Sequence, residues 1–378
     1  MHSEKENLSY GLPEEIIAAR VSRLLNKASV EILSWKTEMI SFRSYAPSTR
    51  YMLSISGVAR TCGRRSKWRM LVKELQRPAG DPFESGWDRE VNAYERIVTY
   101  VPPTCRLRVP RFLGADRPSN ESARLWIEYV EGQPARHWGI STWGTLAAGL
   151  ANLQSKFLED CHLFSEPWLN HNDLRQWIET DRANMFPINL NDSTLRLSAP
   201  LVDADLMRVV SDLWRERNRF IDRLDSLTQT ICHNDIWSGN AVAENIDSPE
   251  PRSVIFDWQL VGPGPLGGDL AFAVAAGVWL GLFPRDGISS IESSLLSGYE
   301  LGLNESGHEA LVHEAKEAFV LTAAMRYAFM LPQLLEDLAN RQRLRLVIED
   351  SGLDAQELLK RRADLIRAGA IWALRGRS

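Results

Sequence analysis

Two neighbouring stretches decide how this chain folds: Ile231-Cys-His-Asn-Asp-Ile-Trp-Ser-Gly-Asn240 and Val254-Ile-Phe-Asp-Trp-Gln259. In the first, Asp235 lies two positions after a His, and Asn240 follows five residues later. In the second, Asp257 ends a short apolar run that is typical of a buried strand. A carboxylate beside a nucleophile, with two oxygen ligands for magnesium, is the layout of a phosphoryl-transfer centre. Asn and Asp are also favoured in turns, so the isolated motif fits a pair of ordinary turns equally well.

An acceptor hydroxyl is a poor nucleophile, and a nearby carboxylate can orient it and accept its proton. Asp235 is the candidate for this role, and Asn240 and Asp257 offer the hard oxygen ligands that Mg²⁺ prefers. The same tripeptide recurs at His171-Asn-Asp173, but the residue five positions later is Ile178. We interpret that copy as an ordinary turn or helix N-terminus.

Composition narrows the class of protein. The chain has 378 residues, enough for two domains or one bilobal unit, and a net charge of -5, which gives no basic face for nucleic acid. Its four cysteines have no metal-ligand spacing, which predicts reduced thiols in a cytoplasmic protein. The N-terminus lacks the apolar core of a signal peptide, and no apolar run reaches membrane-spanning length; the longest candidate is 270–283. Oligomeric state stays open.

The first third of the chain reads as a small β-rich domain. A helical period over 13–34 predicts one or two leading helices. Alternating patterns separated by turn residues then predict an antiparallel sheet with one helix. The expected strands are 37–43, 50–57, 67–73, 111–114 and 124–130, and the helix is 88–97.

Beyond a candidate hinge at 131–134, helical periods dominate. The predicted helices are 141–158, 172–183, 203–229, 270–283 and 359–377, and short apolar strands interrupt them within 231–262. We therefore expect an α+β fold with two lobes. Residues 1–130 form a small antiparallel sheet lobe, and residues 131–378 form a larger, mostly helical lobe.

Two charged residues in the small lobe complete the pattern. Lys73 ends an alternating strand, where its ammonium can bind phosphates as a point charge. Glu90, on the next helix, can pair with Lys73 and hold it in place. Taken alone, most Lys and Glu residues are solvated surface, but their order before Asp235, Asn240 and Asp257 favours a functional role.

Strand Lys, helix Glu, hinge, Asp/Asn loop and metal Asp, in this order, resemble the kinase-like superfamily. The HxDxxxxN spacing, the Trp-Ser-Gly within it and the later Asp269-Leu-Ala resemble the aminoglycoside phosphotransferase and choline kinase branch. The loop 233–240 is also similar to that of fructosamine kinases. The resemblance covers roughly 37–340 and is most specific over 231–271.

The resemblance implies a bilobal kinase fold that binds ATP or GTP with Mg²⁺ and phosphorylates a small-molecule hydroxyl. It also implies a role for each matching position. These are the catalytic base Asp235, the magnesium ligands Asn240 and Asp257, the phosphate-binding Lys73 with its partner Glu90, the adenine-binding hinge Glu128, Tyr129 and Val130, the structural carboxylate Asp269 and the bracing His233. In the turn that should cover the phosphates, we expect contacts from Tyr45, Ser48 and Thr49 to substitute for the usual Gly.

The chain departs from the family pattern in several places. The turn 44–49 has no Gly, Asn234 stands where Gly is usual, and Gln154 stands where His is frequent. Trp258 and Gln259 follow the metal Asp in place of Phe-Gly, which disfavours a protein-kinase-style switch.

The sequence thus predicts a small-molecule kinase, with a catalytically inactive nucleotide-binding scaffold as the alternative. The acceptor stays open among aminoglycosides, choline-like amines, ketosamines and other alcohols. We expect its pocket between the 231–240 loop and the helices after 270. There, Glu300, Glu336 and Asp337 are candidates to meet a cationic acceptor, although a solvated helix face is the commoner role for each.

Overall fold

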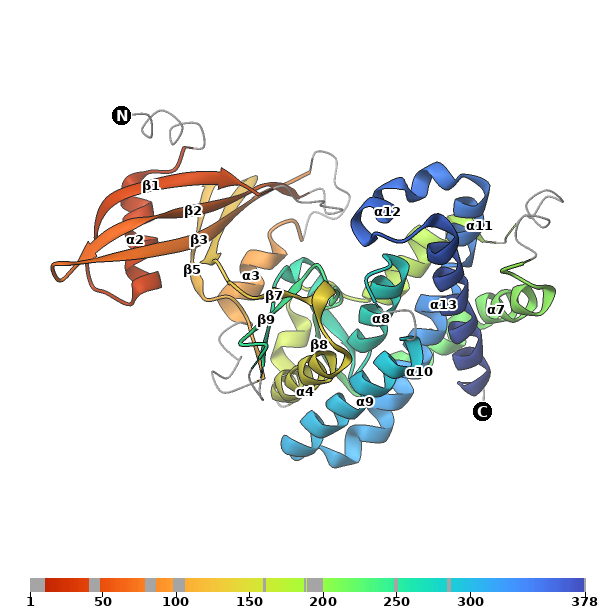
Figure 1. Cartoon of the computed structure of the whole chain (residues 1–378). Helices are drawn as coiled ribbons and strands as arrows, with labels where there is room; N and C mark the ends of the chain where they lie inside the picture. The colour runs from red at the N-terminus through yellow and green to blue at the C-terminus, as the bar shows by residue number, and fades with distance from the viewer. Residues whose placement is uncertain are drawn as a thin grey trace. The chain divides into compact units, whose positions relative to one another are not determined.

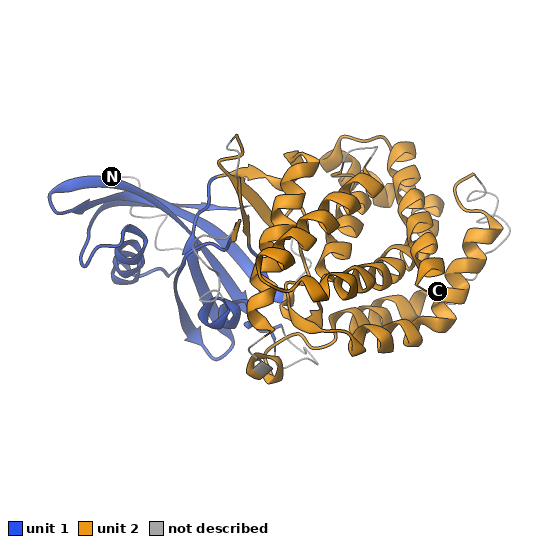
Figure 2. Ribbon diagram, turned by 90° about the horizontal axis from the view of Figure 1, so that it is seen from below, with its two compact units in different colours: residues 1–102, 108–131, 256–259 blue, residues 103–107, 132–255, 260–378 orange. Residues whose placement is uncertain are grey.

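The structure is a computed structural model that describes residues 11–40, 48–78, 86–97, 106–158, 161–186, 188, 200–247, 251–283 and 287–376. The chain forms two compact units, shown in blue and orange in Figure 2. Unit 1 comprises Met1–Pro102, Arg108–Glu131 and Phe256–Gln259, and unit 2 comprises Pro103–Leu107, Gly132–Ile255 and Leu260–Ser378. The sequence placed one boundary between residues 130 and 131. The units divide after Glu131 and again around Phe256–Gln259, which carries Asp257.

Unit 1 is built on a five-stranded antiparallel sheet in the order β1-β2-β3-β6-β5 (Figure 1). Its strands are β1 (Glu31–Met39), β2 (Thr49–Thr61), β3 (Arg64–Gln76), β5 (Phe112–Ser119) and β6 (Ser122–Glu128). The β2–β3 hairpin turns at Cys62 and Gly63, which both have positive φ, as a tight two-residue hairpin requires. Alternate residues of β3, including Trp68, Met70 and Val72, are buried in the core of the unit.

Helix α2 (Glu14–Leu25) packs Ile17 and Val21 into the same core. It ends at Asn26, which adopts the left-handed conformation and donates its backbone N–H to Arg23. The expectation of helix as far as residue 34 is therefore wrong. The chain from Glu31 forms β1, because apolar, β-branched and aromatic side chains alternate there against β2.

Helix α3 (Arg89–Arg96) completes unit 1 and buries Glu90, Val91 and Tyr94. It contacts β5 and β6. A buried Glu on a helix requires a partner for its charge, and the site described below provides one.

Unit 2 is mostly helical. Its main helices are α4 (Ile140–Phe157), α5 (Asp173–Gln176), α7 (Ala204–Ser226), α8 (Asp269–Trp279), α9 (Ile288–Glu305), α10 (Val312–Ala328), α11 (Leu331–Ala339), α12 (Arg345–Ser351) and α13 (Ala355–Arg375). The remaining strands of the chain are short: β4 (Leu107–Arg108), β7 (Gln133–Pro134), β8 (Gln229–Cys232), β9 (Ala241–Glu244), β10 (Arg252–Ile255) and β11 (Gly262–Pro265). β10, β9 and β7 are neighbours in one sheet, and β8 pairs with β11 in another.

Helices α4 and α9 approach each other closely because glycines line their contact. A Cβ atom added at Gly298 would lie 2.0 Å from the carbonyl oxygen of Gly144, and one at Gly302 would lie 2.2 Å from that of Ala148. Such distances exclude any side chain at these positions. This packing brings Gln154 of α4 and Tyr299 of α9 within hydrogen-bond distance of each other.

The expected class, an α+β chain with a small antiparallel sheet and a larger helical part, is confirmed. The sequence predicted that no apolar run reaches membrane-spanning length, and this prediction was wrong. Among the described residues, the helical run Glu309–Ala339 is long and apolar enough to cross a membrane by length and composition. However, 83% of its most apolar window is buried inside the structure, as in a core helix.

Candidate active site

The loop between β8 and β9 in unit 2 carries His233, Asp235 and Asn240. β8 pairs with β11, which fixes the start of the loop. The carboxylate of Asp269 then holds the backbone of the loop. Asp269, the first residue of α8, accepts the backbone N–H of His233 at 2.8 Å and that of Asn234 at 2.7 Å. The sequence predicted a structural carboxylate near the loop. In the structure, the two oxygens of Asp269 accept the N–H groups of two consecutive residues, and we call this arrangement the clamp.

Asp269 is itself held by side chains from α4 and α9. Gln154 donates to Asp269 at 3.0 Å, and the hydroxyl of Tyr299 donates to the amide oxygen of Gln154. All three residues are buried. Burial raises the pKa of Asp269 to about 6, although the two backbone hydrogen bonds oppose the shift. Gln154 therefore connects the clamp to the α4–α9 contact, a role that sequence reasoning missed.

Asn234 explains a departure from the family pattern. Its φ is 62°, in the left-handed region, where Gly is the usual residue and Asn is the best tolerated alternative. Its side-chain amide donates to the carbonyl oxygen of Leu260 at 3.0 Å. The Asn side chain thus adds a hydrogen bond that a Gly at this position lacks.

Asp235 is positioned by its own loop. The amide nitrogen of Asn240 donates to Asp235 Oδ2 at 2.8 Å and to the Asp235 carbonyl at 3.0 Å. The backbone N–H of Asp235 donates to Nδ1 of the buried His233 at 3.2 Å. Oδ1 of Asn240 has no hydrogen-bond partner among the described residues, so an amide oxygen suited to a hard cation remains available.

Unit 1 brings together the buried Lys73 and Glu90 and the partly exposed Asp257. Lys73 Nζ lies 2.7 Å from Glu90 and 2.8 Å from Asp257, and the lysine is only 5% exposed. Burial alone lowers the pKa of Lys73, but the charges of Asp257 and Glu90 outweigh it and raise the pKa. Burial also raises the pKa of Glu90. The expected Lys–Glu pair is thus present in the structure, and the second Asp joins it.

Asp257 has a φ of 66°, a strained conformation for a residue other than Gly, and its side chain is 37% exposed. Such strain is frequent at functional sites. In the part of the chain that the structure describes, no group of three or more His, Cys, Asp and Glu residues could hold a metal on its own.

The other expected nucleotide contacts lie in unit 1. The Glu128 carboxylate is already engaged by Arg108 at 2.9 Å and by the backbone N–H of Arg111 at 3.1 Å. The Tyr129 ring lies 3.6 Å from the guanidinium carbon of Arg69, and Val130 is half-buried. A nucleotide contact from Glu128 would therefore use its backbone.

Of the phosphate-covering turn, the structure describes only the end. Ser48 is buried, its carbonyl accepts the N–H of Gln76 at 2.7 Å, and Thr49 begins β2. Residues 41–47, which hold the rest of the turn, lie outside the described residues.

The His171-Asn-Asp173 copy of the tripeptide is a helix N-terminus, as expected, since Asp173 begins α5. It is also part of the surroundings of the loop. Asp173 forms a buried ion pair with Arg326 of α10 at 2.5 Å, and both residues line a cavity of about 110 Å³ together with Asn234 and Asp269. Sequence reasoning missed Asp173 and Arg326, because only the fold brings residues so distant in sequence together.

The three carboxylates expected to meet a cationic acceptor already have partners. Glu300 pairs with Lys316 at 2.7 Å, Glu336 pairs with Arg343, and the buried Asp337 pairs with Arg362 at 2.5 Å. Their charges are neutralised within the protein. These residues therefore give no support to a cationic acceptor.

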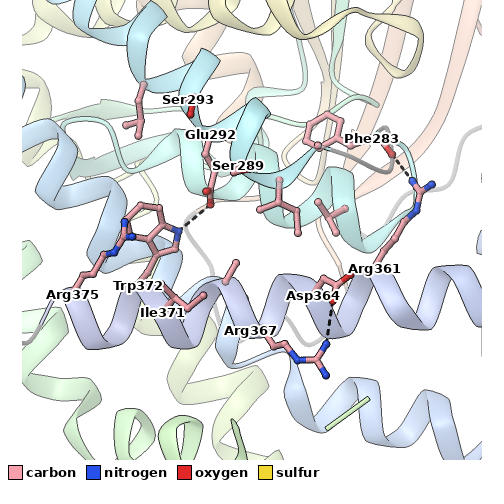
Figure 3. Close-up of a pocket in the computed structure, with 15 residues that line it drawn as sticks. Phe283, Ser289, Glu292, Ser293, Arg361, Asp364, Arg367, Ile371, Trp372 and Arg375 are labelled. Carbon is pink, nitrogen blue, oxygen red and sulfur yellow. Dashed lines mark hydrogen bonds and ion pairs between the residues drawn. The ribbon is translucent and has the colours of Figure 1, made fainter. Parts of the chain in front are cut away.

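A larger cavity of about 540 Å³ lies between the start of α9 and α13 (Figure 3). Several of its polar groups bond to other groups of its lining: Trp372 donates to Glu292, Arg367 donates to Asp364, and Arg361 donates to the Phe283 carbonyl. No residue of the 231–240 loop lines it. We assign no role to this cavity in the chemistry of the loop.

A family model described as the phosphotransferase enzyme family matches residues 75–299, more than half of the chain. The match includes Glu90, Asp235, Asn240 and Asp257, and it begins two residues after Lys73. No match is found among curated protein sequences.

Several solved structures resemble the chain remotely. A complex of the amicoumacin kinase hAmiN with AMP-PNP, Ca²⁺ and Ami has a TM-score of 0.47 and 12% identity, over 95% of this chain and 100% of that one. A thermostable mutant of aminoglycoside phosphotransferase APH(4)-Ia with ADP and hygromycin B has a TM-score of 0.44 and 11% identity, over 93% and 98%. A Plasmodium vivax ethanolamine kinase has a TM-score of 0.47 and 10% identity, over 90% and 83%.

Proposed function

We propose that this chain, which belongs to the phosphotransferase enzyme family, is a kinase that transfers the γ-phosphoryl group of ATP to a hydroxyl of a small molecule. One observation carries the proposal. The carboxylate of Asp235 is held by Asn240 on a loop whose backbone is clamped by Asp269. A carboxylate fixed in this way suits the orientation of an acceptor hydroxyl, which phosphoryl transfer requires.

Asp235 is the proposed general base. It accepts the proton of the acceptor hydroxyl as that oxygen bonds to the γ-phosphorus, while the bond from phosphorus to the bridging oxygen breaks and ADP leaves. His233 supports the loop without transferring a proton, because it is buried and its Nδ1 accepts the Asp235 N–H.

The remaining residues are proposed to bind the nucleotide. Lys73, held by Glu90, binds the α- and β-phosphates as a point charge. The Asn240 amide oxygen and the Asp257 carboxylate would hold Mg²⁺, which neutralises charge on the transferring phosphates. We propose further nucleotide contacts from Glu128, Tyr129 and Val130 to the base and from Ser48 and Thr49 to the phosphates. GTP in place of ATP fits the same residues.

The rival from another class is a scaffold that binds nucleotide without turnover. Against it, Lys73, Glu90, Asp235, Asn240 and Asp257 are all present, and the described contacts within each unit hold them in ordered positions.

A coupled assay of ADP release separates the two functions. Wild-type protein and Asp235→Ala are tested with Mg²⁺ and ATP or GTP against panels of amino sugars, amino alcohols, sugars and sugar acids. ADP release that requires an acceptor and disappears in Asp235→Ala supports the kinase. Nucleotide binding in wild-type protein, measured by calorimetry, without acceptor-dependent release on any panel favours the scaffold. Absence of nucleotide binding contradicts both.

A further inference from the structure

A short π-helix, Trp177–Arg182, follows α5 in unit 2. π-Helices are rare and occur frequently at functional sites. Its first and last residues stack, with the guanidinium carbon of Arg182 4.7 Å from the centre of the Trp177 ring. A second guanidinium, that of Arg326, also lies 4.7 Å from the same ring and 5.0 Å from that of Phe272. Two cationic groups therefore share one indole.

The two guanidiniums are unequally compensated. Arg326 has the carboxylate of Asp173 at 2.5 Å. Within the described part of the chain, Arg182 has no carboxylate within ion-pair distance and makes only long contacts, 3.5 Å to Gln333 Oε1 and 3.7 Å to the Met185 sulfur. The Nε–H groups of both arginines are buried and lack an acceptor among the described residues. Buried donors without partners are costly, which indicates that something is missing at this place.

The pKa of Arg182 also indicates that a bound anion would stabilise this cluster. Burial lowers the pKa of the Arg182 guanidinium, and the charge of Arg326 adds to the shift, although Asp181 opposes it. A guanidinium disfavoured by burial and by a like charge gains from a bound anion, because the anion supplies both the opposite charge and the missing acceptors.

This cluster adjoins the catalytic loop. Arg326 lines the 110 Å³ cavity together with Asn234, the residue before Asp235. Thr322, one turn before Arg326 on α10, lines the same cavity, and its buried hydroxyl has no hydrogen-bond partner in the described structure. Arg182, Arg326 and Thr322 thus each have a buried polar atom without a partner among the described residues, and the last two line the cavity beside the loop.

We propose that the acceptor carries an anionic group, a carboxylate or a phosphate, which binds Arg182 and Arg326 beside Trp177. The inference rests on the proposed transfer to a hydroxyl and names the class of acceptor for that reaction. The planar donors of Arg suit either anion. It also agrees with the pairing of Glu300, Glu336 and Asp337, which leaves those carboxylates no free charge for a cation.

Matched acceptors test the proposal. ADP release is measured with sets of related polyols that carry a neutral, carboxylate or phosphate group at one end, such as ribose, ribonate and ribose 5-phosphate, or glycerol, glycerate and glycerol 3-phosphate. We expect an anionic member to have the lowest KM in its set, and the carboxylate and phosphate arms to show which anion is preferred. Arg182→Gln is expected to raise the KM of the anionic acceptor roughly 10- to 100-fold, the value of one charge-assisted hydrogen bond, with little change in kcat.

The control is Arg215→Gln, which removes an exposed guanidinium with the same change of net charge. It is expected to leave both kinetic constants unchanged. Arg182→Lys keeps the charge without the planar donors and is expected to restore part of the affinity. Preference for a neutral or cationic acceptor overturns the proposal, as does an equal effect of Arg182→Gln on charged and neutral acceptors.

If no acceptor in the sets is turned over, inorganic sulfate decides the matter by calorimetry at constant ionic strength. Saturable binding that is lost in Arg182→Gln and kept in Arg215→Gln supports the anion site. Equal binding by wild type and Arg182→Gln, or no binding, overturns it. The proposed function fails separately, because its failure is seen as ADP release that survives Asp235→Ala or never depends on an acceptor.

Discussion

The two His-Asn-Asp tripeptides of unit 2 have the same sequence and bend the backbone in the same way. Asn172 has a φ of 64° and Asn234 a φ of 62°, both in the left-handed region that Asn tolerates. Their surroundings differ. His171 is exposed and contacts the Glu166 carbonyl, whereas His233 is 1% exposed and accepts the N–H of Asp235.

The Asp residues differ as well. Asp173 forms an ion pair with Arg326, whereas Asp235 accepts a hydrogen bond from the neutral amide of Asn240. A base must be free to accept a proton, and a carboxylate bound to a guanidinium is a poor acceptor because the positive charge stabilises its ionised form. The tripeptide thus fixes the backbone, and the ion pair with Arg326 makes the Asp173 carboxylate a poor base.

The largest effect is expected at the second copy. Asp235→Asn keeps the shape and a hydrogen bond to Asn240 but removes the base. We expect kcat to fall roughly 10²- to 10⁴-fold while the free energy of unfolding changes little. Steady-state kinetics with the best acceptor and urea denaturation measure both. A variant that keeps its kcat, or loses it only by unfolding, would show that Asp235 is not the base.

The first copy should respond in the opposite way. Asp173→Asn leaves the buried Arg326 without a counter-charge, and we expect a loss of roughly 3–5 kcal/mol in the free energy of unfolding. The kcat of the folded fraction should stay far above that of Asp235→Asn. Asp225→Asn is the matched control, since Asp225 pairs with Arg175 on the surface and its loss should cost at most about 1 kcal/mol. Equal stability of Asp173→Asn and Asp225→Asn would contradict a structural role for the first copy.

Much of this contrast was predictable from sequence. The spacing from Asp235 to Asn240 and the absence of Asn after Asp173 separated the two copies, and alternation predicted the strand of Lys73 and its sheet. The partner Arg326 was not predictable, because it lies 153 residues from Asp173 and only the packing of α10 joins them. The same holds for Gln154, which donates to Asp269, and for Tyr299, which donates to Gln154, because both hydrogen bonds depend on the packing of α4 against α9. The start of β1, residues 31–36, was missed because local periodicity cannot show where Asn26 ends a helix.

The clamp formed by Asp269 on the backbone of His233 and Asn234 can be tested by measuring stability as a function of pH. The pKa of Asp269 is raised by burial from 3.8 to about 6, so its contribution to stability is complete below pH 3.8 and is lost as pH rises through about 6. Asp269→Asn removes this titration and places an amide against a backbone N–H, so it should be less stable than wild type. The deficit is expected to be about 1 kcal/mol larger at pH 5 than at pH 7.5. Urea denaturation of both proteins at the two pH values measures it, and a deficit independent of pH would refute the assignment.

The smallest changes in the free energy of unfolding are expected at Asn172 and Asn234, the Asn of each tripeptide. Ala at a left-handed position costs about 1 kcal/mol or slightly more, so Asn172→Ala should lose that amount alone, because the Asn172 side chain makes no hydrogen bond to any described residue. Asn234→Ala should lose about 1 kcal/mol more, since it also removes the bond to Leu260. Gly has no conformational penalty here, so Asn234→Gly should recover the first part and not the second. Denaturation of the three variants measures these differences. If Asn172→Ala and Asn234→Ala are equally destabilised, the side chain of Asn234 contributes nothing, and its replacement of the usual Gly is a matter of backbone conformation alone.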